Sequence, residues 1–551
     1  MKKHFLLFIS LVLLASVVFG GGIVTNSNQS AYWVRTLVRD AAIGPDAVHF
    51  NPAGLTKLSD GFHFSLSSQT IFQNKAVTND YAFLSPRPKK FIGDVVAPVF
   101  PSFFATWKKN KIAISFGFTT IGGGGGATFE DGLPAFEQGI SDMAHFLSHY
   151  GATDYRREVY FKGTSRYLGY QLGLTYQIND VISVYGGLRY VTVKNTYEGY
   201  LKNVEVNMGG NWTEVSDVFS GMAAQAGAGA TGASSISGTM GALIGGGVPG
   251  TFTLAQAEGA GAISPEQRAQ IEGGLTALGI PASLQIGQIQ TACDGAYVQY
   301  TAAAAEASQT AALTGMLFNQ TADIEQKGNG FAPIIGVNLA INEKLNIGLK
   351  YEFKTRIQVK NKRLSQNDFI IDMTDAGAPI YFLQDGTKVD NDMPAVFSAG
   401  IDYKVTPKLT AAGGFHYYWD KDVSYGKQIN YEYVKNSEVI DDNNYELAFG
   451  LEYSLTDKWF LSGGFLLAHT GVSQDYQSDL SYSLSSNTFG GGLGYKLNDK
   501  LMINIGVSYT GYKEDTKYYP HIYRPTETQI SSTDTYSKDA LILAIGLDLS
   551  L

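Results

Sequence analysis

Cysteine, histidine and charged residues are all scarce in this sequence. Its 551 residues include one cysteine, Cys293, and eight histidines, and only 17% of them are charged. A single cysteine excludes a disulfide framework. A lipoprotein anchor is also excluded, because it requires a cysteine directly after the N-terminal apolar stretch, and none is there. The formal net charge of −9 makes nucleic acid a poor partner, since that role needs a basic surface.

The sequence also lacks a long internal apolar run. No internal stretch reaches the roughly 18 apolar residues of a membrane-spanning helix, which excludes a helical membrane protein. Glycine, tyrosine and phenylalanine are abundant instead, with 63, 33 and 31 residues, and the mean hydropathy is −0.05. Transmembrane β-barrels alternate apolar and polar residues, so their average hydropathy is unremarkable while their aromatic content is high.

The first 20 residues have the pattern of a secretory signal peptide. Lys2, Lys3 and His4 form a basic start, and an apolar stretch follows from Phe5 to Phe19. Small residues then provide a cleavage site near Gly20. About 15 apolar residues are too few for a retained membrane anchor. The chain is therefore predicted to be exported.

Five segments share a pattern of strand, short polar turn and strand. Within them apolar residues alternate with glycine, polar or charged ones: Leu345, Ile347, Leu349, Tyr351 and Phe353 share one face, with Lys350 and Glu352 on the other. Such alternation fits a wall between lipid and water. We predict an all-β fold, a transmembrane antiparallel barrel of about 14 strands that ends at Ala540–Leu551. The five segments begin at Gly173, Gly336, Ala399, Phe449 and Gly491.

Three segments interrupt this pattern. Residues 21–58 have no steady helical or strand period, and an irregular segment ahead of a barrel indicates an N-terminal hatch, a plug inside the lumen. Residues 134–150 indicate a short helix. Residues 208–325 form a long loop rich in alanine and glycine, with helices expected at 264–278, capped by Ser264, and at 296–317. We expect this extracellular insertion in the barrel (59–551) to fold as a small helical cap over the mouth.

The hatch segment ends in a motif that carries a resemblance. Asn51, Pro52, Ala53, Gly54 and Leu55 resemble the N-terminal region of the FadL/TodX family of outer-membrane transporters for hydrophobic compounds. Together with the signal peptide and the hairpins, the likeness extends over nearly the whole mature chain except the insertion. It implies a 14-stranded barrel with a hatch, an apolar pocket in the lumen, and sideways release of long-chain fatty acids or aromatic hydrocarbons at a kink in the third strand.

The resemblance also implies site residues. The glycine run Gly122, Gly123, Gly124, Gly125 and Gly126 corresponds to the kink, and glycine suits a bulge that no side chain obstructs. The hatch motif is expected to pack near it. The residues at the start of the hatch, Ile23 and Val24 among them, are expected to reach the pocket, although a phenylalanine of the family pattern is absent. An alternative is that the glycines form only a flexible loop.

Further candidates come from side-chain chemistry. Tyr32 and Trp33 either line the pocket or anchor the hatch. Four arginines either contact a ligand carboxylate inside the lumen or bond to acids of the barrel wall, such as Glu452. They are Arg35, Arg39, Arg166 and Arg189. Other clusters are read as solvated loop residues or turns, and no metal site is predicted from them. These clusters are His145 with His149 and Asp142, Asp390–Asp392, and Asp441–Asn444.

These patterns favour passive transport across a Gram-negative-type cell outer membrane. The alternatives are a surface-binding or adhesion barrel, in which the insertion is the working part, and a less selective porin. An enzyme is disfavoured, because the eight histidines show no catalytic spacing. No cofactor is expected. The expected partners are a hydrophobic small molecule, outer-membrane lipid and lipopolysaccharide, and the barrel-assembly machinery, with the protein acting as a monomer.

Overall fold

The computed structural model describes residues 22–364, 369–373, 378–381, 383–429, 432–523 and 525–551. The predicted signal peptide and Gly21, the first residue of the predicted hatch, lie outside these residues. Among the described helices, none combines the length and the apolar character needed to cross a membrane.

The predicted barrel is confirmed: 14 antiparallel strands close on themselves through the pairing of the last strand with the first. Two wall strands are each divided into two pieces, β8 with β9 and β12 with β13. The strands of the wall are β1 (Gly61–Asn79), β2 (Lys89–Lys109), β3 (Ile112–Phe129), β4 (Ala152–Gln177), β5 (Ile182–Met208), β7 (Gln320–Ala340), β8 (Leu345–Glu352) with β9 (Gln358–Arg363), β12 (Lys388–Asp390) with β13 (Val396–Thr406), β14 (Leu409–Tyr418), β17 (Ile440–Ser454), β18 (Trp459–Val472), β19 (Ser486–Lys496), β20 (Leu501–Tyr512) and β22 (Thr528–Ser550).

The short turns at one end of the barrel share one hydrogen-bond pattern. At Asn342, for example, the side-chain Oδ1 accepts the backbone N–H of Lys344 at 2.8 Å and of Leu345 at 3.0 Å. A side chain that bonds the backbone two residues ahead fixes a tight turn and thereby the strand register. The other members are Asn179, Thr406, Thr456 and Asn498.

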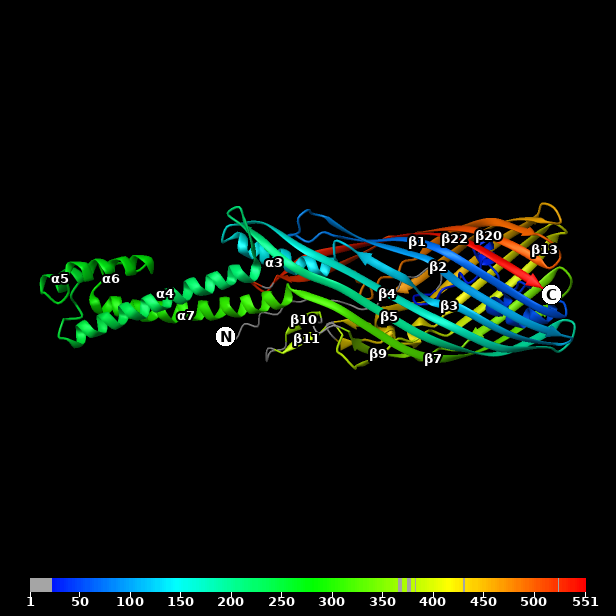
Figure 1. Ribbon diagram of the computed structural model, residues 1–551, viewed down its shortest axis with the longest axis horizontal. Helices are drawn as coiled ribbons and strands as arrows, with labels where there is room; N and C mark the ends of the chain where they lie inside the picture. The colour runs from blue at the N-terminus through cyan, green and yellow to red at the C-terminus, as the bar shows by residue number, and fades with distance from the viewer. Residues whose placement is uncertain (1–21, 365–368, 374–377, 382, 430–431, 524) are drawn as a thin grey trace.

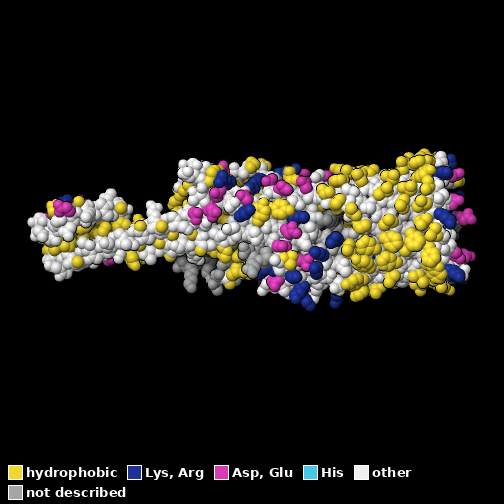
Figure 2. Space-filling model, in the orientation of Figure 1, with side chains coloured by type: hydrophobic (Ala, Val, Ile, Leu, Met, Phe, Trp, Pro, Cys, Tyr) yellow, Lys and Arg dark blue, Asp and Glu magenta, His cyan; other side chains and the backbone are white. Residues whose placement is uncertain are grey.

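The outer surface carries an apolar belt next to these turns (Figure 2). On β22 the side chains of Leu541, Leu543, Ile545 and Leu547 are exposed, whereas Ala544 between them is buried. The alternation predicted from the sequence therefore separates a lipid-facing side from a lumen side, as in transmembrane barrels.

Residues 22–58 lie inside the barrel, where Figure 1 shows them in dark blue behind the wall strands. Their short elements are α1 (Ala31–Thr36), α2 (Ala47–Phe50) and the 3-10 helix η1 (Pro52–Lys57). Glycines on the lumen side of the wall form the seat of this hatch. A Cβ on Gly464 would lie 2.1 Å from the Thr36 carbonyl oxygen, and one on Gly348 would lie 2.1 Å from the Asp40 carbonyl oxygen. Only glycine permits the hatch backbone to approach this closely.

The opposite end of the barrel carries the long connections. Helix α3 (Pro134–Ser148) matches the predicted short helix and packs on β4. Between β5 and β7 two long helices, α4 (Val215–Gly245) and α7 (Ile286–Leu317), form a hairpin. The smaller elements are β6 (Asn211–Glu214), α5 (Leu254–Gly259), α6 (Pro265–Ala277), β10 (Ile370–Met373), β11 (Pro379–Tyr381), η2 (Asp420–Asp422), β15 (Gln428–Ile429), β16 (Glu432–Tyr433), α8 (Asn436–Val439) and β21 (Asp515–Tyr523).

The hairpin differs from the predicted cap. It extends away from the mouth along the long axis of the barrel (Figure 1). Its tip has an apolar cluster of its own. Ser264 caps α6 as predicted and Pro265 is its first residue. The cluster contains Ile236, Met240, Leu254, Ala257, Ile263, Ile271, Leu275, Ile286, Ile289 and Cys293.

Candidate functional site

The ladder between β2 and β3 is interrupted. The two strands pair from Lys109–Ile112 to Ser102–Thr119 and again at Val95–Ala127, with a register shift between these two stretches. The β3 residues inside the interruption, 120–126, include the whole glycine run. On its other side β3 stays paired with β4, with bulges between Thr120 and Gly122 and between Gly123 and Gly125. The wall therefore has a local break at the place where the resemblance puts a kink.

A segment of the hatch binds β3 inside this break. Thr25 forms an isolated antiparallel bridge with Gly122, and the Asn26 N–H donates to the Ile121 carbonyl at 2.9 Å. The Asn26 side-chain amide donates to the Gly123 carbonyl at 2.6 Å. A Cβ on Gly122 would lie 2.4 Å from the Val24 carbonyl oxygen, and Gly123 has a φ of +68°. Both positions therefore require glycine, and the hatch takes the place that β2 leaves vacant.

Ile23 and Val24, two of the predicted pocket residues, are buried beside this break. They belong to a packed apolar cluster that joins the hatch to the wall strands, and two of its members, Ile121 and Met393, also line a cavity beside it. The cluster also contains Ile121, Tyr167, Val191, Val193, Ile357, Val359, Val389, Met393, Val423, Tyr425, Val439, Ile440 and Tyr476.

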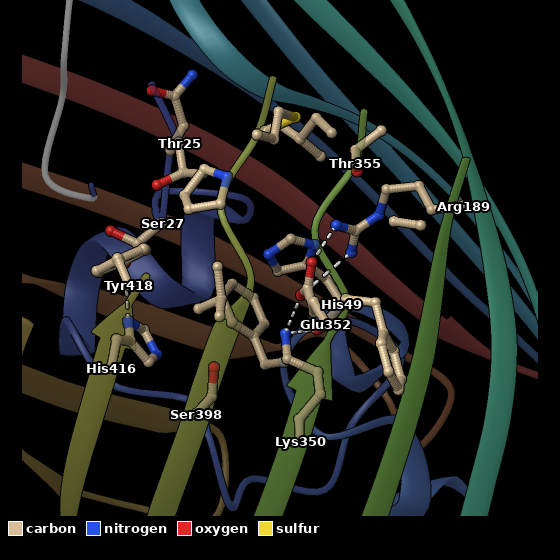
Figure 3. Close-up of a pocket in the computed structure, with 18 of the residues that line it drawn as sticks. Thr25, Ser27, His49, Arg189, Lys350, Glu352, Thr355, Ser398, His416 and Tyr418 are labelled. Carbon is tan, nitrogen blue, oxygen red and sulfur yellow. Dashed lines mark hydrogen bonds and ion pairs between the residues drawn. The ribbon is translucent and has the colours of Figure 1, made fainter. Parts of the chain in front are cut away.

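A small cavity of about 50 Å³ lies between the hatch and the wall in this region (Figure 3). One side of it is strongly charged. Arg189 forms an ion pair with Glu352, and the Lys350 ammonium lies 2.7 Å from the other Glu352 oxygen and donates to the His49 carbonyl at 2.7 Å. Burial, followed by the nearby Lys350 and Arg189 charges, lowers the pKa of the hatch residue His49 well below its usual range, so His49 is neutral. The expected pocket is thus not purely apolar.

A second polar group faces the cavity from the opposite side. His416 on β14 lies between two carboxylates: its Nε2 is 2.7 Å from Asp40 of the hatch and its Nδ1 is 2.8 Å from Glu446. The Tyr418 hydroxyl donates to the same Glu446 carboxylate at 2.7 Å. His416 thereby ties the hatch to β14 and β17 across the lumen. Sequence reading missed it, because the only signal was its place on the lumen face of β14.

None of the predicted pocket and carboxylate-contact residues of the hatch lines the cavity, Ile23 and Val24 included. Trp33 is buried in the apolar packing between hatch and wall. The Tyr32 ring lies between the guanidinium groups of Arg35 and Arg39, each 3.7 Å from its centroid. Arg35 bonds Glu452, the wall acid named as the alternative to a ligand carboxylate, and Arg39 bonds Asp46 within the hatch. Both arginines therefore hold the hatch and leave ligand contact to other residues.

The hatch motif contacts the wall near the short turns. The Asn51 side-chain amide donates to Asn338 at 2.7 Å. The carbonyl of Pro52 accepts the Thr175 hydroxyl at 2.8 Å, and that of Ala53 accepts the Ser183 hydroxyl at 2.6 Å. Gly54 and Leu55 are buried in η1. These contacts lie at the turn end of β4 and β5, whereas the glycine run pairs with β4 at 164–167. The motif therefore anchors the hatch away from the kink, contrary to the expectation that it packs beside it.

The clusters weighed as metal sites do not assemble one. The described residues contain no group of three potential ligands placed for a metal ion. Asp142 instead accepts the Tyr81 hydroxyl at 2.6 Å and lies 2.7 Å from His521, while His145 stacks on Phe83.

Comparison with known proteins identifies relatives of this barrel. The family model for outer membrane protein transport proteins (OMPP1/FadL/TodX) matches residues 271–549. A Pseudomonas aeruginosa FadL homologue has a similar structure, with a TM-score of 0.57 and 14% identity over 96% of this chain and 100% of the other. The Pseudomonas putida toluene transporter TodX is also similar in structure, with a TM-score of 0.52 and 11% identity over 96% of this chain and 100% of the other. No curated protein matches the sequence.

These similarities agree with the hatch-filled barrel described above. At such low identity the two structures support the fold alone, and the family match, which covers half of the chain, supports the assignment. Proteins of this kind are outer-membrane transport channels for hydrophobic compounds and are not enzymes. The chain belongs to the OMPP1/FadL/TodX family of outer membrane transport proteins.

Proposed function

We propose that this protein carries long-chain fatty acids passively across the outer membrane and releases them sideways through the wall. The observation that carries the proposal is the break between β2 and β3, which is occupied by residues 24–26 of the hatch. A molecule held beside the hatch has a route through the wall there once this segment moves. A route along the axis meets the rest of the hatch, which disfavours a porin.

Entry of cargo requires a rearrangement. A volume of about 50 Å³ holds one or two waters, whereas benzene needs a cavity of roughly 150 Å³. The hatch segment at the break is held by a few backbone and amide hydrogen bonds, among them Asn26 to Ile121 and Gln29 to Thr120. Each contributes about 1 kcal/mol. Burial of an alkyl chain at about 25 cal/mol per Å² is sufficient to offset their loss.

The chemistry of the cavity favours an amphiphilic cargo over a plain hydrocarbon. Arg189 and Lys350 both meet Glu352 at the cavity edge, so a ligand carboxylate there gains two cationic hydrogen-bond donors. Phe50, Ile121, Phe353 and Met393 supply apolar lining to the same cavity. A fatty acid presents both a carboxylate and an alkyl chain, whereas toluene leaves the charged side unused.

Uptake of radiolabelled oleate by a host that lacks its own transporter tests the proposal. Removing Gly124 and Gly125 shortens β3 so that it can pair with β2, and we expect uptake to fall at least roughly tenfold because the exit is closed. Removing Gly246 and Gly247, in the turn after α4, deletes two glycines far from the break and is expected to leave uptake unchanged. Full uptake by the shortened β3 variant would contradict sideways release, and faster uptake of toluene than of oleate would contradict the assigned cargo.

A further inference from the structure

A row of basic side chains crosses the outer surface of the barrel. Arg166 of β4 is paired with Lys194 of β5, Lys194 with Lys327 of β7, Lys327 with Lys360 of β9, and Lys360 with Lys388 of β12. All five side chains point outward, because their chain neighbours, such as Tyr167, Val193, Val359 and Val389, are buried in the apolar cluster inside the barrel. The prediction that Arg166 contacts a ligand inside the lumen is therefore wrong. Figure 2 shows dark blue side chains gathered at the edge of the apolar belt on this face.

Without a bound anion, this row of like charges destabilises the sheet. Like charges directly opposite one another on neighbouring strands destabilise a sheet. Glu325 offsets part of the repulsion, since its carboxylate binds Lys194 at 2.7 Å and also Lys327. Asp390 lies near the Lys388 end, where it accepts a hydrogen bond from Gln358 at 3.1 Å. The row still has more cations than carboxylates, and 64% of the Lys327 side chain is exposed.

The row lies just beyond the apolar belt on the side of the long loops. On β4 the exposed belt residues are Tyr170, Leu172, Leu174 and Tyr176, and Arg166 is two outward positions further from the turns than Tyr170. On β7 the belt ends at Phe331, and Lys327 follows at the same interval. This is the level at which lipid headgroups meet the barrel.

The surface between these side chains is hollowed. A depression of about 360 Å³ is lined by Arg166, Lys194 and Lys327 together with Tyr190 and Asn329. A phosphate in it would meet guanidinium and ammonium donors and a side-chain amide, the groups that bind phosphate oxygens in proteins. The β1–β22 side differs: there the outward residues beyond the belt are Asn74 and Asp539, which bond each other at 3.1 Å.

We propose that this basic row binds the phosphate groups of a phosphorylated glycolipid of the lipid A class in the outer leaflet. The row lies at the level of the lipid headgroups, at the edge of the apolar belt. The depression provides space for a phosphate group, and the excess of cations provides the complementary charge. Arg166 pairs with Gly123 of the glycine run. The bound headgroup would therefore lie beside the break in the wall.

The test titrates the full-length protein in detergent with bis-phosphorylated lipid A and with its dephosphorylated form, and native mass spectrometry counts the bound molecules. The test variant combines Arg166→Gln, Lys194→Gln, Lys327→Gln and Glu325→Gln, so that no carboxylate remains unpaired. We expect at least roughly tenfold weaker binding of the phosphorylated lipid, because each basic residue near an anionic lipid surface adds to the attraction. Wild type is expected to prefer the phosphorylated form by a similar factor.

The matched control carries Lys344→Gln and Lys408→Gln, in the short turns at the opposite rim. It changes the net charge by the same amount and is expected to bind like wild type. Equal binding by wild type and test variant, or no preference for the phosphorylated lipid, would overturn the proposal. Displacement of the lipid by millimolar inorganic phosphate would assign the site to free phosphate. Mobility on an unheated gel shows whether the test variant is folded. If it is not, the preference of wild type for the phosphorylated over the dephosphorylated lipid decides the question.

Discussion

At the scale of single residues, Arg35 shows how the hatch is held. Its side chain is fully buried, stacks on Tyr32, and bonds Glu452 and Ser462 of the wall as well as Asn504 at 3.0 Å. A buried ion pair contributes little net stability compared with apolar residues of the same size. Removing only one partner is different, since the remaining charge is left in a low-dielectric site.

This asymmetry makes a prediction for two variants. Arg35→Met is expected to lower the free energy of unfolding by about 3 kcal/mol, because Glu452 loses its counter-ion. Adding Glu452→Leu removes the unpaired charge and is expected to recover most of the lost free energy of unfolding. Urea unfolding of the detergent-solubilised barrel, followed by tryptophan fluorescence, measures both changes. Equal destabilisation by the single and the double variant would show that the loss comes from packing alone.

The buried carboxyl group of Asp420, in the extracellular helix η2, predicts that the stability of this loop depends on pH. Its Oδ1 accepts the Tyr425 hydroxyl, and its Oδ2 is buried with no hydrogen-bond partner in the described structure. Burial raises the pKa of Asp420 to about 6, above the value of about 3.9 in an unfolded chain. The folded loop therefore favours the protonated form, and its stabilisation is full below about pH 4 and is lost as the pH rises through 6.

Hydrogen exchange of residues 420–429 checks this expectation. In wild type the loop should open more readily at pH 8 than at pH 4, by about 2 to 3 kcal/mol in opening free energy. Asp420→Asn has no charge to bury and should show no such difference. The same pH dependence in both proteins would assign the effect to another group.

At the scale of elements, the hatch and its glycine seat form one unit. Gly464 and Gly463 are neighbours on β18, but only Gly464 faces the hatch. A Cβ on Gly464 would lie 2.1 Å from the Thr36 carbonyl oxygen, whereas a Cβ on Gly463 would find its nearest neighbour at 3.7 Å. Gly464→Val is therefore expected to displace the hatch, and Gly463→Val is expected to be tolerated.

Conductance in planar bilayers reports the position of the hatch. Wild type and Gly463→Val should conduct small ions weakly because the bore is filled, and Gly464→Val should open it to a steady current several times larger. Low conductance of Gly464→Val, in a sample that migrates as a folded barrel, would show that the hatch adapts to the added side chain.

The sequence predicted the strands of the barrel wall better than the contacts of the hatch inside it. Each strand must present apolar side chains to lipid and small or polar ones to the lumen, so strands such as Leu345–Glu352 are visible in a local pattern. The contacts of the hatch are long-range, and nothing within residues 21–58 indicates that Asp40 meets His416. The whole of α4 was also missed, because its alanines and glycines give no clear helical period.

At the scale of the whole molecule, the helical hairpin is an addition to a barrel that closes without it, and in the described structure only its base packs on the rest, through Phe219 against Phe146 of α3. Strands β5 and β7 pair directly from Ile182–Leu339 to Leu201–Gln320, so the wall closes below the hairpin without its help. The tip packs on its own apolar cluster, and the hairpin extends away from the mouth (Figure 1). The hatch, the cavity and the break between β2 and β3 all lie elsewhere.

Replacing residues 215–317 by a short glycine–serine turn is therefore expected to leave both folding and transport intact. The ends of β5 and β7 are neighbours, and closing a loop with a short linker costs little entropy. Oleate uptake by the shortened protein should stay within about twofold of wild type, since the cavity residues Arg189, Lys350 and Glu352 are untouched. If uptake falls while the barrel still migrates as folded on an unheated gel, the hairpin lies on the ligand route, and capture of the cargo begins well outside the membrane.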